Sequence, residues 1–345
     1  MSRSDEEYEA DAKVLKQAME GWGTDEEPMI LLTVMRSNDD RQQIMKFYKS
    51  SYGEDLMAEL KDECDDDFGK VIVGMFRTPC DFDCYQLNKA MKGGGTNEQV
   101  LIEIVGSRTN VELEAIKPRY NELFEIELEA HVMDECSGDL KRLLVSLLQC
   151  NRSSDDNEVD EEKCNKDLAD LYEAGEGTWG TDESTFHKIF TNRSPKELRF
   201  INNEYAKSCG KTLREVIDDE FGGDIKELLK TVLHSILNPA DYFATRLREA
   251  FAGLGTNDND LIRVMISRDE IDMQEIKEIY LARYKRTLYA DIDDECSGDY
   301  KKILLGIAAS DIKSKKEEEV VVQKVLPPQF SNGTNVFTKE GVTVD

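Results

Sequence analysis

The sequence predicts an all-α protein built from four related repeats, and three observations carry this prediction. A glycine-containing hexapeptide occurs four times in the 345 residues. Apolar residues recur at the three- and four-residue spacing of helices, and no segment before the C-terminal tail keeps the alternation of a strand. Charged residues make up 34% of the chain, above the roughly 25% usual for globular domains, which favours helix-rich surfaces.

The repeat is defined by fixed spacings. The glycines that directly precede the threonine in the four hexapeptides, at positions 23, 95, 180 and 255, lie 72, 85 and 75 residues apart, and a polar linker at 151–158 accounts for the longer middle interval. An arginine follows each of these glycines by 13 residues and a glutamate follows by 40 residues. The arginines are Arg36, Arg108, Arg193 and Arg268, and the glutamates are Glu63, Glu135, Glu220 and Glu295.

Five helices per repeat are expected, which the first repeat illustrates. Helical patterns cover residues 11–20, the stretch after the loop, and residues 41–51, 55–61 and 68–77. Thr24 with Glu27, and Thr96 with Gln99, have the spacing of capping boxes, so the threonines are predicted to begin the second helices. Each repeated arginine then falls at the end of its second helix, where we expect it to meet the helix C-terminus and to enter a buried ion pair.

The repeats divide the whole chain. The predicted segments are a head (1–10), repeat 1 (11–79), repeat 2 (83–151), a linker (152–165), repeat 3 (166–238), repeat 4 (242–311) and a C-terminal tail (312–345). The tail contains two apolar stretches, 320–322 and 325–328, so it is predicted either to lie extended over the concave face or against the head, away from the lipid side, or to be disordered.

Composition limits the function classes. The formal charge is −28, since 44 basic residues accompany 72 acidic ones, and this excludes a nucleic-acid-binding protein of the usual basic kind. The charge also opposes direct attraction to anionic lipid, although a cation could bridge the two negative surfaces. No run of about 18 apolar residues and no apolar N-terminal stretch occurs, so neither a membrane span nor a secretory signal is expected.

The eight cysteines are expected to be reduced thiols, because they are scattered and form no Cys-x-x-Cys pair. Cys80 and Cys84 are the one close pair. The residues between them are interpreted as a linker turn, and a local disulfide there is left open.

The loop and the distant glutamate together point to a metal. Taken alone, Gly-x-Gly-Thr ends one helix and begins the next. The glutamate at a fixed distance adds two carboxylate oxygens to the carbonyls that a glycine turn can expose, and an oxygen-rich shell is what Ca²⁺ requires. No EF-hand loop and no Walker lysine is present.

Four five-helix repeats with Gly-x-Gly-Thr-[Asp/Asn]-[Glu/Asp] and an acidic residue 40 positions later resemble the annexin family. The third repeat departs from the motif, because Thr178 stands where the first glycine should be and its loop is one residue longer; it is similar to the family's variant third-repeat loop. The resemblance covers residues 10–311 and is close at 95–98 and 297–302. It implies a curved α-helical disc that binds Ca²⁺ as its cofactor on one face and docks reversibly on anionic phospholipid. It leaves open self-association on the membrane and a channel-like role for Arg108 and Arg268.

The resemblance also implies the ligands. The predicted Ca²⁺ ligands are the carbonyls of Met19, Gly21 and Gly23 with Glu63; of Met91, Gly93 and Gly95 with Glu135; of Gly175, Thr178 and Gly180 with Glu220; and of Phe251, Gly253 and Gly255 with Glu295. Weaker secondary ligands are Thr24, Glu26, Glu98, Glu183 and Asp258, for which favouring a helix N-terminus is the alternative role.

Trp22 and Trp179 are the two tryptophans, and both stand directly before a loop glycine. An indole at a loop apex suits the interface of a bilayer, so both are predicted to contact lipid beside the bound ions; the alternative is that Trp179 packs back on its own repeat.

The predicted function is therefore reversible, Ca²⁺-dependent binding to anionic membranes, by a cytoplasmic protein that becomes peripheral to membranes when calcium rises; export without a signal is left open. An enzyme is not expected, because His131, His187 and His234 lie in no catalytic motif. A helical scaffold that binds proteins and keeps vestigial calcium sites is the alternative.

Overall fold

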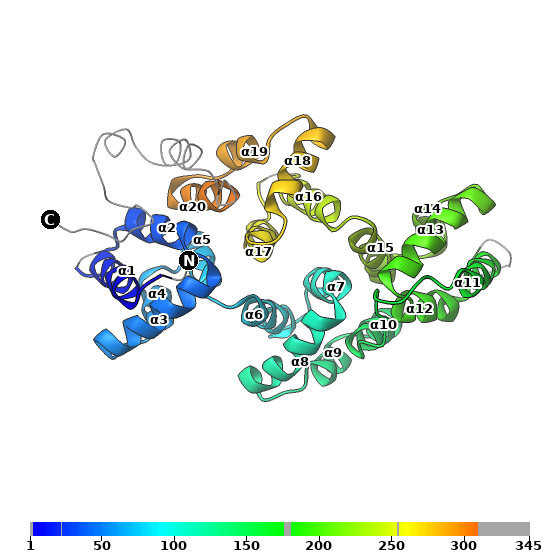
Figure 1. The fold of residues 1–345 in the computed structure, drawn as a ribbon, viewed down its shortest axis with the longest axis horizontal. Coiled ribbons are helices and arrows are strands. Elements are labelled where there is room, and N and C mark those ends of the chain that lie inside the picture. Colours follow the sequence, from blue (N-terminus) through cyan, green and yellow to red (C-terminus); the bar gives the residue numbers. More distant parts are fainter. Residues whose placement is uncertain (1–2, 22, 176–180, 254, 310–345) are drawn as a thin grey trace. The chain divides into compact units, whose positions relative to one another are not determined.

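The computed structural model describes residues 3–21, 23–175, 181–253 and 255–309. Within these ranges the chain forms twenty helices and no strand, which confirms the all-α prediction (Figure 1). None of the described helices is both long and apolar enough to cross a bilayer. The predicted tail, 312–345, lies outside the described residues.

Five helices make up each repeat. Repeat 1 contains α1 (Asp5–Ala18), α2 (Glu26–Met35), α3 (Asn38–Tyr52), α4 (Leu56–Glu63) and α5 (Asp67–Met75). Repeat 2 contains α6 (Pro79–Met91), α7 (Glu98–Ser107), α8 (Asn110–Phe124), α9 (Leu128–Glu135) and α10 (Gly138–Leu148). Repeat 3 contains α11 (Glu161–Ala174), α12 (Glu183–Asn192), α13 (Pro195–Cys209), α14 (Leu213–Glu220) and α15 (Gly223–Leu237). Repeat 4 contains α16 (Pro239–Ala250), α17 (Asp258–Arg268), α18 (Met273–Tyr284), α19 (Leu288–Glu295) and α20 (Gly298–Ala309).

The first helix begins earlier than the sequence patterns indicated. Ser4 caps α1, because its hydroxyl accepts from the Glu7 N–H at 3.3 Å while a Glu7 carboxylate oxygen accepts from the Ser4 N–H at 2.6 Å. Residues 5–10, assigned to a head from the sequence, are therefore the first turns of α1.

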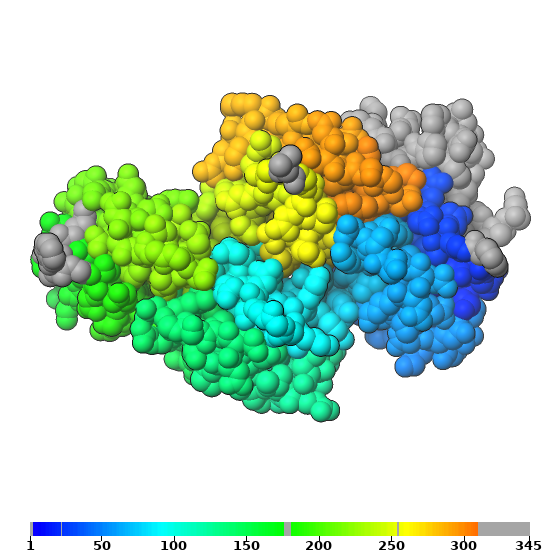
Figure 2. Space-filling model, turned by 180° about the vertical axis from the view of Figure 1, so that it is seen from behind, coloured from blue at the N-terminus to red at the C-terminus, as the bar shows by residue number. Residues whose placement is uncertain are grey.

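The repeats pair into two compact units. Among the described residues, unit 1 comprises 3–79 and 243–309, which hold repeat 1 and most of repeat 4, and unit 2 comprises 80–242. In unit 1, α2 packs on α20 and α17 packs on α5; in Figure 2 the blue surface of repeat 1 borders the orange surface of repeat 4. In unit 2, α7 packs on α15 and α12 packs on α10. Both units thus use one rule: the second helix of each repeat packs on the fifth helix of its partner.

Glycines permit this close packing. A Cβ on Gly306 would stand 2.9 Å from Val34 in unit 1, and a Cβ on Gly106 would stand 2.8 Å from Thr231 in unit 2. Because protein interiors are close-packed, even one methyl group at either position would force the helices apart.

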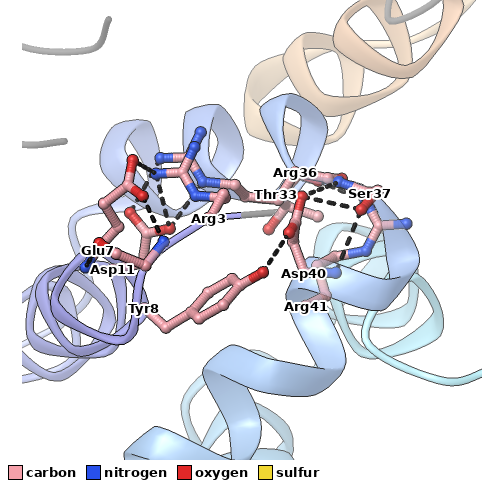
Figure 3. Close-up of polar contacts among 10 residues, drawn as sticks. Arg3, Glu7, Tyr8, Asp11, Thr33, Arg36, Ser37, Asp40 and Arg41 are labelled. Atoms are coloured by element: carbon pink, nitrogen blue, oxygen red, sulfur yellow. Dashed lines mark hydrogen bonds and ion pairs between the residues drawn. The ribbon is translucent and has the colours of Figure 1, made fainter. Parts of the chain in front are cut away.

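Buried ion pairs join the first two helices of three repeats, as expected for the repeated arginines. Arg36 binds Asp11 through two hydrogen bonds of 2.7 and 2.9 Å, and Figure 3 shows that Arg3 also directs its guanidinium to Asp11, at 3.7 Å. The equivalent pairs are Asp83 with Arg108 and Asp167 with Arg193.

Repeat 4 departs from this pattern because Phe243 stands where the aspartate should be. The Arg268 guanidinium lies 4.4 Å from the centre of the Phe243 ring and pairs instead with Asp272 at 2.8 Å. A cation–π contact and a local ion pair therefore replace the buried carboxylate.

Candidate metal sites

All four glycine loops close with the same backbone bond. The residue after the loop threonine donates its N–H to a carbonyl near the end of the preceding helix: Asp25 to Ala18 (2.8 Å), Asn97 to Ala90 (2.9 Å), Asp182 to Ala174 (2.7 Å) and Asn257 to Ala250 (2.8 Å). The bonded residues lie seven apart in three loops and eight apart in the third, so the longer third loop keeps the closure.

Backbone conformation explains why these loops need glycine. Gly21 and Gly253 have φ of 115°, and Gly23 and Gly255 have φ of 87°, a region that L-residues rarely adopt. Gly93 and Gly95 have φ of 110° and 109°. A Cβ at any of these six positions would meet nothing within 4 Å, so the loops are open to an approaching ligand.

The first predicted carbonyl of the first, second and fourth loops belongs to a residue whose side chain is buried. Met19, Met91 and Phe251 are at most 7% exposed and stand at or just after the end of their helices. Their side chains pack in the core, so only their backbone carbonyls can contact a ligand.

The four glutamates occupy one structural position, the last residue of the fourth helix. In three repeats a buried cysteine follows, and its pKa reports the carboxylates around it. Burial first, and nearby carboxylates second, raise the pKa of each thiol to about 11; the carboxylates are Asp66, Glu26 and Glu63 at Cys64, Glu98 and Glu135 at Cys136, and Asp258 and Glu295 at Cys296. The fixed glutamate and the acidic residue after the loop therefore lie around the same buried thiol.

The threonines do not begin the second helices, so the capping-box prediction is wrong. Asp25 and Asn97 are the N-cap residues of α2 and α7, and neither makes a side-chain cap bond. The Thr96 hydroxyl instead donates to the Glu135 carbonyl and carboxylate, both at 3.2 Å. The sequence did not reveal this hydrogen bond, because a capping box and a hydrogen bond from the loop to the glutamate both require a hydroxyl at the same position.

The same tie forms in the third repeat, where Thr181 donates to Glu220 Oε2 at 2.7 Å. Gly175 also lies beside Glu220, because a Cβ on Gly175 would stand 3.6 Å from the Glu220 Cγ. Two of the predicted third-site ligands are thus adjacent. Thr178, Gly180 and Trp179 lie outside the described residues, as does Trp22.

The predicted secondary ligands differ in their hydrogen-bond partners. Glu26 accepts from the Thr24 hydroxyl at 2.5 Å, and Asp258 accepts from the Tyr300 hydroxyl at 2.9 Å. Glu98 and Glu183 stand in the first turns of α7 and α12, the position that a helix dipole favours for an acid.

In three repeats, a lysine six residues after the glutamate bonds the backbone of the helix that carries the glutamate. The sequence patterns considered above did not include it. Lys141, Lys226 and Lys301 donate to the carbonyls of Met133, Asp218 and Asp293, two residues before each glutamate, at 2.8, 2.7 and 3.2 Å. The constant spacing of six was the available signal.

Repeat 1 lacks this lysine because its chain turns differently after Glu63. Gly138, Gly223 and Gly298 have φ near 60°, whereas Asp66 at the equivalent position is extended and caps α5 by accepting from the Gly69 N–H at 2.9 Å. Gly69 stands where the lysine should be, and a Cβ there would lie 2.1 Å from the Cys64 carbonyl oxygen. No side chain fits at position 69.

The donor set suits a hard cation. Open glycine loops offer carbonyl oxygens and each glutamate offers a carboxylate, which are ligands of Ca²⁺ rather than of Zn²⁺. Among the described residues no cluster of three or more His, Cys, Asp or Glu side chains forms.

Known proteins share both the sequence and the fold. The annexin family model matches four segments, residues 10–75, 82–147, 167–232 and 242–307. Annexin A6 of Rattus norvegicus is 43% identical over 301 residues, which are 87% of this chain and 45% of that protein, so this chain spans about half of it.

Annexin A13 of Homo sapiens is 40% identical over 87% of this chain and 95% of its own length. The solved structure of calcium-bound annexin (Sm)1 is 32% identical, with a TM-score of 0.78 over 89% of this chain and 92% of that chain. The chain therefore belongs to the annexin family, whose members are known in general as Ca²⁺-dependent phospholipid-binding proteins.

Proposed function

We propose that this protein binds anionic phospholipid reversibly through Ca²⁺ ions held in its glycine loops. The single observation that carries the proposal is the open, positive-φ loop of repeat 2, whose threonine bonds the glutamate that ends the fourth helix. In the proposed sites the ligands are Met19, Gly21, Gly23 and Glu63; Met91, Gly93, Gly95 and Glu135; Gly175, Thr178, Gly180 and Glu220; and Phe251, Gly253, Gly255 and Glu295.

Each site would supply one carboxylate and several neutral carbonyls. Such a site binds Ca²⁺ weakly by itself, at the roughly 10⁻⁴–10⁻³ M end of the protein range. A bound ion would keep positions that the protein does not fill, and lipid phosphate oxygens could occupy them. Several weak sites that engage one bilayer give strong binding through avidity. The ions also overcome the repulsion between a chain of charge −28 and an anionic surface.

The lysines at 141, 226 and 301 support this role as positioning residues. Each anchors the last turn of the helix that presents the site glutamate. The fixed turn lowers the conformational entropy that the carboxylate loses when an ion binds.

Co-sedimentation with liposomes tests the proposal. Replacing Glu63, Glu135 and Glu295 by glutamine removes the one formal charge that each proposed site places on its ion. We expect the calcium concentration for half-maximal binding to rise at least tenfold. The matched control replaces Glu6, Glu114 and Glu275, which are exposed on α1, α8 and α18, and should leave binding unchanged.

Unchanged binding in the triple site variant would overturn the ligand assignment. Lipid binding that is indifferent to calcium in the parent protein would favour the scaffold alternative. Annexins are not enzymes in general, and the proposal needs no catalytic residue.

Trp22 and Trp179 extend the proposal to the lipid itself. Each follows a loop glycine position and would place an indole at the bilayer interface beside a bound ion. Tryptophan emission of the Trp22→Phe and Trp179→Phe variants should shift to the blue when calcium and anionic vesicles are both present. If the emission of one variant is the same with and without vesicles, the tryptophan that remains in that variant does not contact lipid.

A further inference from the structure

One tyrosine joins the fifth helix of repeat 4 to the start of its second helix. The Tyr300 hydroxyl, in the first turn of α20, donates to Asp258 Oδ1 at 2.9 Å, and Asp258 is the first residue of α17. Both side chains are partly buried. Burial and the Asp258 carboxylate raise the pKa of the Tyr300 phenol well above its ordinary value, so the phenol stays protonated and keeps donating.

This hydrogen bond needs residues that occur only in repeat 4. Tyr300 follows its loop glycine by 45 residues, and the residues at this spacing in the other repeats, which carry no hydroxyl, are Phe68, Leu140 and Ile225. The acid differs as well, because an aspartate stands three residues after the loop glycine of repeat 4, where each other repeat has a glutamate. Repeat 4 therefore combines a shorter acid with a hydroxyl that reaches it from α20.

The bond holds Asp258 next to the proposed calcium loop. Asn257, the preceding residue, closes the fourth loop through its N–H. After burial, Asp258 and Glu295 are the groups that most raise the pKa of the Cys296 thiol, so both carboxylates lie around this side chain. Tyr300 follows Cys296 by four residues and thus links Asp258 to the turn that comes directly after the site glutamate.

We propose that Tyr300 is a positioning residue for calcium at the fourth loop, where its hydroxyl holds the Asp258 carboxylate in place as a secondary ligand. The inference rests on the proposed function, since it assigns a role within one of the proposed sites. A carboxylate has two oxygens, so Asp258 can accept from the phenol with Oδ1 and still bind an ion with Oδ2. A ligand that is fixed before the ion arrives loses less conformational entropy on binding.

The equivalent acid of repeat 1 has different neighbours. Glu26 accepts from the Thr24 hydroxyl of its own loop. Lys302 of α20 pairs with Asp299 at 2.7 Å, which raises the pKa of the lysine most, and the carboxylates of Glu27 and Glu26 add to the rise. An ammonium group competes with a calcium ion for a carboxylate, whereas a phenol adds no charge. The secondary position of repeat 4 should therefore hold an ion more tightly than that of repeat 1.

Calorimetric titration of the full chain with calcium tests the proposal. Glu63, Glu135 and Glu220 are replaced by glutamine in every variant, so that repeat 4 is the one repeat that keeps its site glutamate. In this background Tyr300→Phe should weaken calcium binding about three- to tenfold, because it removes one hydrogen bond to a charged ligand and keeps the ring. Asp258→Asn should weaken binding at least as much, and adding Tyr300→Phe to it should cause no further loss.

Tyr289→Phe is the matched control. The Tyr289 hydroxyl, on α19 of the same repeat, donates to the Ala308 carbonyl at 2.7 Å, near the opposite end of α20 from Tyr300. This variant also removes one phenol hydrogen bond and should leave the calcium affinity unchanged. Melting temperatures without calcium verify that each variant is folded.

Two results would overturn the proposal. Equal calcium affinity in the background chain and its Tyr300→Phe variant would leave the bond a purely structural role. A higher affinity in the variant would mean that Tyr300 withholds Asp258 from the ion. Both results leave the proposed function intact, because the parent chain still binds calcium. A parent chain that binds no calcium would instead refute the proposed function, and this inference with it.

Discussion

Units 1 and 2 contain the same loop motif but treat the fixed glutamate differently. In unit 2, Thr96 and Thr181 hold Glu135 and Glu220 by their hydroxyls, and both glutamates are half-buried. In unit 1, Glu63 and Glu295 are exposed, and the Thr24 hydroxyl binds Glu26 instead. The difference teaches that the motif determines which groups are present, whereas local packing determines whether the carboxylate is already held at the loop.

The two units also differ in their buried charges. Unit 2 keeps an aspartate–arginine pair in both of its repeats, whereas unit 1 keeps one such pair and replaces the other with Phe243 and Asp272. All three histidines of the chain, His131, His187 and His234, belong to unit 2.

The largest effect is expected from breaking a buried pair in unit 2. Asp83→Ala leaves the Arg108 guanidinium, 4% exposed at its side chain, without its bidentate partner. We expect a loss of about 3–5 kcal/mol in the free energy of unfolding, because an uncompensated buried charge remains. Thermal denaturation followed by circular dichroism measures it.

Phe243→Leu is the matched change in unit 1. It removes the cation–π partner of Arg268 but leaves the ion pair with Asp272, so a loss of about 1 kcal/mol from that contact is expected. Equal losses in the two variants would show that the units do not differ in this respect.

An intermediate effect should separate the calcium loops. Thr96→Val and Thr181→Val preserve shape but remove the hydroxyls that hold Glu135 and Glu220. Calcium affinity in unit 2 should fall about three- to tenfold, because one charge-assisted hydrogen bond is lost at each site. Calorimetric titration with calcium measures the change.

Thr24→Val and Thr256→Val are the controls in unit 1 and should have a smaller effect. If calcium affinity rises in the unit 2 variants, the hydroxyl competes with the ion for the carboxylate rather than positioning it.

The smallest effect concerns pH. Burial lowers the pKa of His187, so the neutral ring is favoured in the folded state. Stability from this group is complete above the unfolded pKa of about 6.5 and is lost as pH falls through the lower folded value. His187→Gln should therefore flatten the decline of the melting temperature in mild acid. An unaltered slope would assign the decline to other groups.

Much of the fold followed from the sequence because its determinants are local. Helical periodicity and the constant spacing from loop glycine to arginine predicted the helices and the ends of the second ones. The errors arose where one residue type serves two purposes. Thr96 has the spacing of a cap but binds Glu135, and the residues between Cys80 and Cys84 resemble a turn but continue a helix.

Other features depend on contacts between distant segments. The lack of space at Gly69 comes from the approach of the Cys64 carbonyl, which no local pattern reveals. The pairing of repeat 1 with repeat 4 likewise has no signature within either repeat taken alone.

The shared backbone closure of the loops has a consequence for how such proteins diversify. Because an N–H to carbonyl bond closes each loop, the residue just before its second glycine carries no structural duty in the closure. The chain places Trp22, Gly94, Trp179 and Leu254 at this position. The closure bond itself therefore sets no requirement on side-chain size at this sequence position. A single substitution at this position would change the apolar surface that a loop offers to a membrane, and it would leave the fold and the carbonyl ligands unchanged.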